Sequence, residues 1–89
     1  MPILGSTLEF DITASTITDE TVTAVTVTIV DPDGSVVVNG ESATEVDSTW
    51  VYVWQSSETG TAGDYIVKAK AISEINVGKG KLIITMEEA

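Results

Sequence analysis

The stretch that decides the fold is TVTAVTVTIVD, residues 21–31, in which Val25, Val27 and Ile29 alternate with threonines. Successive side chains of a β-strand point to opposite faces, so this period of two predicts a strand with one apolar face. The apolar phase shifts just before Val25, and we therefore expect a bulge or bend near Ala24.

The same alternation recurs in short runs along the whole chain. Strands are expected over residues 7–13, 21–31, 35–38, 42–47, 49–56, 64–72 and 79–86. Val, Ile and Thr make up 34 of the 89 residues, and these β-branched side chains favour sheets over helices. The pattern predicts an all-β, two-sheet antiparallel sandwich of about seven strands, with a small β-barrel as the alternative. The length allows a single domain, residues 1–89, with residues 87–89 as a frayed tail.

Two turn motifs punctuate these strands. Residues 31–34 (DPDG) predict a type I turn with a bulge, because Pro32 pre-sets φ and Gly34 accepts a positive φ. The dipeptide Asn39-Gly40 predicts a two-residue hairpin between the third and fourth strands.

Composition excludes several kinds of chemistry. The chain has no cysteine and no histidine, and its formal net charge is -10. A disulfide framework, a thiolate nucleophile and the usual general base near neutral pH are therefore missing. We expect no enzyme, no cofactor and no catalytic or cofactor-binding residue. A net-negative surface repels phosphate backbones, so no nucleic-acid partner is expected.

The acidic turn around Asp31 and Asp33 suggests a calcium loop only at first sight. Such a loop needs glycine at position six and glutamate at position twelve, and here those positions hold Val36 and Ser42. No metal site is therefore assigned. Weak calcium binding between loop tips, which would use Asp31, Asp33, Asp19 and Glu20, stays open.

Residues 49–56 contain the only cluster of aromatic side chains, Trp50, Tyr52 and Trp54, which alternates with Val51 and Val53. Three interpretations of the aromatic row remain open: it packs in the core with the valines outside, it contacts a partner protein, or it stacks on sugar rings.

The four basic residues of the chain are Lys68, Lys70, Lys79 and Lys81. They form a basic stripe if the strands that carry them pair side by side. The alternative is that they neutralise acidic neighbours and protect a sheet edge. Both the lysines and the aromatic row are candidate contacts for a partner protein.

Residues 61–67 (TAGDYIV) resemble the start of strand F in immunoglobulin-like sandwiches. The resemblance implies a structural role for Gly63, a tyrosine corner at Tyr65 with its hydroxyl bonded to nearby backbone, and a buried Val67 in place of the usual cysteine.

A wider pattern of strands, DPDG turn, aromatic strand and AGDY corner is similar to small immunoglobulin-like proteins of phage and prophage structural gene clusters. It implies a structural protein that binds a protein partner or a larger assembly; homo-oligomers stay open. The alternatives are a module of a prokaryotic surface or adhesion protein and a carbohydrate-binding module.

The start of the chain, residues 1–6, has neither a basic residue nor a long apolar run, and the longest apolar run, residues 50–54, is too short to span a bilayer. We therefore expect no membrane partner, and a protein that is cytoplasmic as synthesised or becomes part of a virion. If the chain is part of a surface protein, the expected location is extracellular.

Overall fold

The computed structural model describes residues 2–13, 22–47, 49–73 and 77–88, and within them it contains strands and no helix. The strands are β1 (Thr7–Ile12), β2 (Val22–Val30), β3 (Val36–Ser42), β4 (Thr44–Val46), β5 (Thr49–Gln55), β6 (Gly63–Ser73) and β7 (Val77–Met86). The all-β class expected from the β-branched composition is confirmed.

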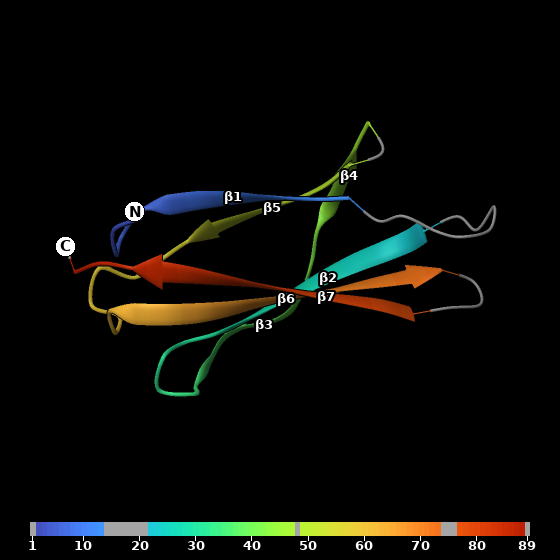
Figure 1. The fold of residues 1–89 in the computed structure, drawn as a ribbon. Helices are drawn as coiled ribbons and strands as arrows, with labels where there is room; N and C mark the ends of the chain where they lie inside the picture. The colour runs from blue at the N-terminus through green and yellow to red at the C-terminus, as the bar shows by residue number, and fades with distance from the viewer. Residues whose placement is uncertain (1, 14–21, 48, 74–76, 89) are drawn as a thin grey trace.

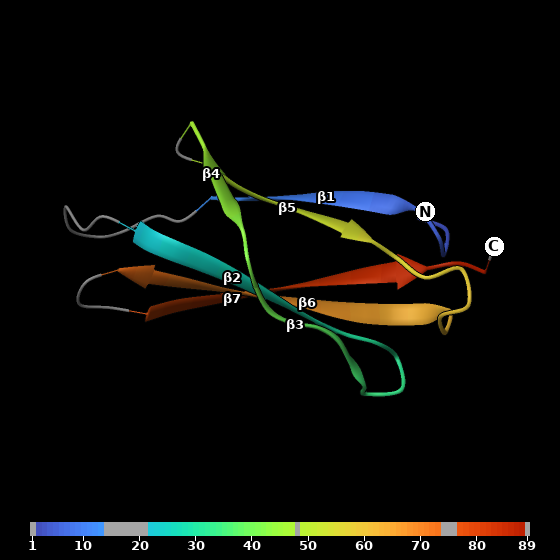
Figure 2. The ribbon, with the colours of Figure 1, turned by 180° about the vertical axis from the view of Figure 1, so that it is seen from behind.

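The strands form two antiparallel sheets that lie face to face as two layers (Figures 1 and 2). One sheet has the order β1-β5-β4, and the other has the order β3-β2-β6-β7. The chain passes between the sheets three times, from β1 to β2, from β3 to β4 and from β5 to β6. Among the described residues no strand belongs to both sheets, so the sandwich is confirmed and the barrel alternative is wrong.

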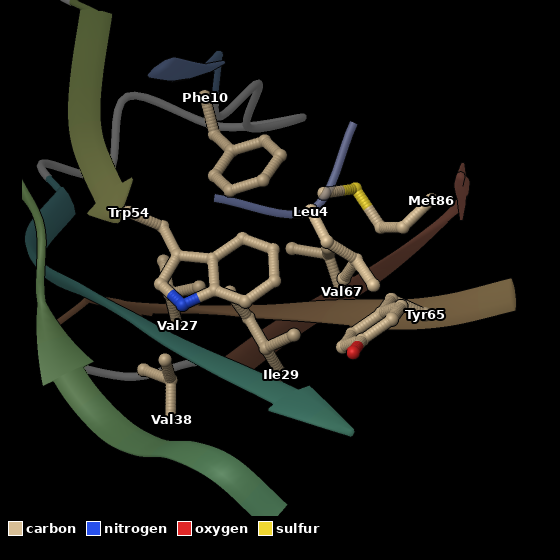
Figure 3. Close-up of a cluster of buried hydrophobic side chains, with 9 residues drawn as sticks. All are labelled: Leu4, Phe10, Val27, Ile29, Val38, Trp54, Tyr65, Val67 and Met86. Atoms are coloured by element: carbon tan, nitrogen blue, oxygen red, sulfur yellow. The ribbon is translucent and has the colours of Figure 1, made fainter. Parts of the chain in front are cut away.

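The core lies between the two layers and is built from the apolar phase of each strand. Val25, Val27 and Ile29 of β2 are almost fully buried, as the alternation in residues 21–31 predicts. Figure 3 shows the larger of two clusters, in which the indole of Trp54 lies among side chains from both sheets. This cluster consists of Leu4, Phe10, Val27, Ile29, Val38, Trp54, Tyr65, Val67 and Met86.

A smaller cluster lies at the other end of the sandwich, where the chain passes from β3 in one sheet to β4 in the other. Val25, Ala43 and Trp50 pack together there. The N–H of Ala43 donates a hydrogen bond of 2.8 Å to the carbonyl of Val25. The small buried side chain of Ala43 therefore marks the point at which the chain leaves one sheet for the other.

The Asn39-Gly40 dipeptide does not form the expected hairpin. It lies inside β3, which runs continuously from Val36 to Ser42. The register with β2 shifts there, and Gly40 adopts a φ of 64°. A glycine with positive φ suits a β-bulge as well as it suits a hairpin turn. Because β2 offers a long partner on one side, the chain continues past the dipeptide as a bulged strand.

Two other local expectations are confirmed. The pairing of β2 with β6 shifts register between Val22 and Ala24, which is the bulge expected near Ala24. After β2, the N–H of Gly34 bonds to the carbonyl of Asp31 at 3.0 Å, and Gly34 has a φ of 86°. The DPDG segment is therefore a tight turn that ends β2.

Tyr65 lies at the start of β6, where its ring is buried and its hydroxyl is bonded to backbone. The hydroxyl donates a hydrogen bond of 2.7 Å to the carbonyl of Thr61, and the ring centroid lies 5.6 Å from that of Trp54. Val67 is buried two residues later. The hydrogen bond expected at Tyr65 and the burial expected at Val67 are confirmed.

At the end of the chain, the frayed tail expected over residues 87–89 is wrong at Glu87, and Leu82 of β7 is more exposed than its inward position suggests. Glu87 is not frayed, because its N–H donates to Pro2 and its carbonyl accepts from Leu4, both at 2.9 Å. Leu82 shares the inner face of its sheet with Val67 but is 53% exposed. The facing sheet has one strand fewer, so the part of β7 that holds Leu82 is left uncovered.

Candidate interaction surface

The four lysines form two directly opposed pairs on adjacent strands. The register of β6 with β7 places Lys68 opposite Lys81 and Lys70 opposite Lys79. The pairing of β2 with β6 adds Thr28 beside Lys68 and Thr26 beside Lys70. The basic stripe that the sequence allowed is therefore present. We call the surface formed by Thr26, Thr28, Lys68, Lys70, Lys79 and Lys81 the lysine face.

The lysine face points outward because the strand period turns the neighbouring residues inward. Val67 and Ala69, on either side of Lys68, lie on the inner face, where Val67 is 5% exposed. All four lysine side chains are exposed. With Ala69 and Gly80, the lysine face lines a hollow of about 440 Å³. Because Ala69 and Gly80 belong to the inward phase of their strands, the hollow lies over the paired strands between the outward lysine side chains.

A row of aliphatic side chains crosses the same outer surface next to the lysines. The register connects Val36 to Val30, Val30 to Ile66 and Ile66 to Ile83, one residue from each strand of the sheet. Val36 and Ile83 are each 55% exposed. Beyond the lysines at the other end, Ile72 of β6 lies opposite the exposed Val77 of β7. Exposed apolar side chains bordered by polar groups are typical of interaction surfaces, and here the aliphatic side chains lie next to the lysines.

The opposed lysines of the lysine face repel each other across the two strands. Like charges directly opposite each other on a sheet are destabilising. Within the described part of the chain, no carboxylate forms an ion pair with any of the four ammonium groups. The neutralisation of acidic neighbours that the sequence also allowed therefore takes no form of direct ion pair among these residues, and it stays a prediction. Edge protection applies at most to Lys79 and Lys81, since β7 is the edge strand and β6 is not.

The aromatic row is not a contact surface. Trp50 and Trp54 are 9% and 8% exposed and lie in the two core clusters, with Tyr52 packed against both. Val53, on the opposite face of β5, is 56% exposed. Two indoles fill the space between the sheets better than two valines, so the aromatic phase turns inward. No exposed aromatic row is left on β5 to stack on a sugar ring or to contact a partner.

The outer surface of the three-stranded sheet carries the opposite charge. The register of β1 with β5 places Glu9 opposite Val53 and Asp11 opposite Val51. Both carboxylates are exposed, and the sheet turns Phe10, between them, into the core. We call the surface formed by Glu9, Asp11, Val51 and Val53 the acidic face.

The carboxylates of the DPDG turn serve the turn itself. Asp31 Oδ1 accepts hydrogen bonds from the N–H groups of Asp33 and Ser35, and Asp33 Oδ2 accepts one from the hydroxyl of Thr61. Asp19 and Glu20, the other expected calcium ligands, lie outside the described residues. Across the residues that are described, no three acidic side chains come together as a metal site. The same residues include no helix that could cross a bilayer.

Comparisons with sequence families, with curated proteins and with solved structures found no match to this chain. The surface is therefore interpreted from its own geometry. Sequence reasoning found the lysines but missed the aliphatic row beside them. The signal was present, because Ile66 and Ile83 have the same parity as the lysines on their strands, out of phase with the buried Val67 and Met86.

Proposed function

We propose that this protein is a non-catalytic immunoglobulin-like β-sandwich that binds a protein partner through its lysine face, as a structural component of a phage or prophage particle. The observation that carries the proposal is the array of four opposed lysines, which have no carboxylate partner among the described residues and lie beside exposed and half-buried aliphatic side chains. An acidic partner surface would supply the missing counter-charges and cover the apolar side chains.

The connectivity supports the immunoglobulin-like part of the proposal. In such sandwiches strands B, E and D are neighbours in one sheet, and strands C, F and G are neighbours in the other, with C′ added beside C in some members. The orders β1-β5-β4 and β3-β2-β6-β7 agree with B-E-D and C′-C-F-G. Tyr65 at the start of β6 occupies the place of the tyrosine corner, at the start of strand F.

The non-catalytic part of the proposal is supported by composition and by the regular, paired strands that carry the site. The chain has no histidine or cysteine to activate a nucleophile. The lysine face lies on regular, paired strands, which hold side chains at fixed spacings and suit recognition of a complementary surface. The assignment to a particle is supported by the resemblance of the turn and corner motifs to phage structural proteins.

Co-expression with the proteins encoded by the genes that flank its own tests the proposal. The mass of each mixture is measured by size-exclusion chromatography with light scattering. We expect the 9.4 kDa chain to enter a larger complex with a capsid, connector or tail protein. The variant K68E/K70E/K79E/K81E should stay free while circular dichroism shows a folded sheet.

The control is E58K/E88K, which changes two exposed acidic residues that do not belong to either face. This variant should bind as the wild type does, which separates the lysine face from a general effect of charge. The proposal is overturned if the lysine-reversed variant binds equally well, or if no flanking protein of a structural class forms a complex with the wild type.

A further inference from the structure

We infer that the lysine face binds the acidic face of a second copy of this chain, so that sandwiches stack head to tail. This inference rests on the proposed function and adds a second copy as a partner: within a stack the lysine face meets another copy, and the lysine face left free at one end meets the flanking structural protein. The two faces are the outer surfaces of the two sheets, which lie on opposite sides of the molecule (Figures 1 and 2).

The charges of the two faces are opposite in sign and match in spacing. Glu9 and Asp11 are two residues apart on β1, as Lys68 and Lys70 are on β6. Side chains two residues apart on one face of a strand are about 7 Å apart, so both ladders have the same repeat. In an aligned stack, each carboxylate meets one row in which two ammonium groups already lie opposite each other.

The apolar side chains of the two faces complete the contact. Val51 and Val53 lie beside the carboxylates on the acidic face, and Ile66 and Ile83 lie beside the lysines. Sheets that pack face to face stay about 10 Å apart, with their strands within about 30° of each other. The exposed Val53 and Ile83, at 56% and 55% exposure, would be covered in such a stack.

The size of the molecule sets an upper limit on the area of this contact. The molecule measures 44 × 25 × 18 Å along its principal axes. A face that uses the two longer dimensions has an upper limit of roughly 1,000 Å², and a standard interface buries about 800 Å² per partner. Because the contact joins two different faces, each added copy leaves one face of each kind free, and the stack extends or closes into a ring.

A charge-swap experiment tests the inference by sedimentation velocity in 0.15 M salt, where long-range repulsion between molecules of net charge -10 is screened beyond about 8 Å. The wild type should show a mass above 9.4 kDa that rises with concentration and falls back in 1 M salt. The variant K68E/K70E/K79E/K81E has two acidic faces, and E9K/D11K has two basic faces. Each variant alone should self-associate at least about tenfold more weakly than the wild type.

The equimolar mixture of these two variants should restore association, because each then offers the face that the other lacks. The control E58K/E88K has the same net charge as E9K/D11K and should associate as the wild type does. The neutral variant K68Q/K70Q/K79Q/K81Q should lose association as the reversed variant does, which excludes misfolding caused by the added acidic side chains.

A wild type that is monomeric at all concentrations overturns the inference, as does a mixture that stays monomeric. If the wild type still binds a flanking gene product, only the second-copy partner is wrong and the proposed function stands.

Discussion

The hydroxyl of Tyr65 joins the start of β6 to the preceding loop through its hydrogen bond to the Thr61 carbonyl. Burial, and next the carboxylate of Asp31, raises the pKa of Tyr65 above its ordinary value of 10.0. The neutral form is thus favoured in the fold. Its contribution to stability is fully present below pH 10 and is lost as pH rises from 10 through the folded pKa.

Replacement of Tyr65 by phenylalanine is therefore predicted to lower the free energy of unfolding by about 1 kcal/mol at pH 7. It should also flatten the fall in stability above pH 10. Urea unfolding at pH 7, 9 and 11 measures both effects. The control is Y52F: the pKa of Tyr52 is also raised, by burial and next by Glu41, but no hydrogen bond holds its hydroxyl among the described residues. An unchanged stability of Y65F at pH 7 would show that the bond to Thr61 contributes nothing.

Two glycines with positive φ allow strain and crowding to be separated. Gly34 has a φ of 86° with no atom within 4 Å of an added Cβ, whereas Gly63 has a φ of 135° and its added Cβ would lie 3.0 Å from Pro32 Cγ. We predict a loss of about 1–2 kcal/mol for G34A and of about 2–4 kcal/mol for G63A. Thermal unfolding of both variants checks the order, which equal losses would contradict.

At the scale of the element, the β6–β7 hairpin carries its lysines at a cost to its own stability. Exchanging Lys79 and Lys81 for glutamate converts two repulsive cross-strand pairs into attractive ones. The variant K79E/K81E is predicted to gain about 0.5–2 kcal/mol in free energy of unfolding at low salt. The gain should shrink in 1 M salt, and K79Q/K81Q should fall between the variant and the wild type.

Urea unfolding at two salt concentrations measures these differences. If the lysines serve partner binding, K79E/K81E should be more stable than the wild type but should no longer bind a partner, since binding sites often trade stability for function. If K79E/K81E is less stable than the wild type at low salt, the lysines serve the fold itself.

The elements also show what a sequence can predict. Alternation identified the strands and the buried phase of β2, because one phase there is polar. It could not choose a face for β5, where Trp54 and Val53 are both apolar and only the volume between the sheets decides. Asn39-Gly40 allowed a hairpin and a bulge equally. The choice depends on the pairing of β3 with β2 and on the place of β4 in the other sheet, and the dipeptide itself determines neither.

At the scale of the whole molecule, the candidate site follows from strand pairing. The sequence placed four lysines on two neighbouring strands, but only the register puts Lys68 opposite Lys81 and the aliphatic row beside them. The unequal width of the two sheets, which exposes Leu82, has no local signal at all. Surfaces made by pairing distant strands are therefore the part of the molecule that sequence patterns describe least well.

The most direct measurement is the rate at which an amine-reactive acetylating reagent modifies Lys68, Lys70, Lys79 and Lys81, read peptide by peptide by mass spectrometry. Rates in the monomeric fraction are compared with rates in the assembled fraction, and a free lysine amide added to each tube serves as the reference. If the lysine face is the contact surface, all four lysines react about tenfold more slowly in the assembled fraction. Equal rates in the two fractions would mean that this face stays in solvent and that the contact lies elsewhere.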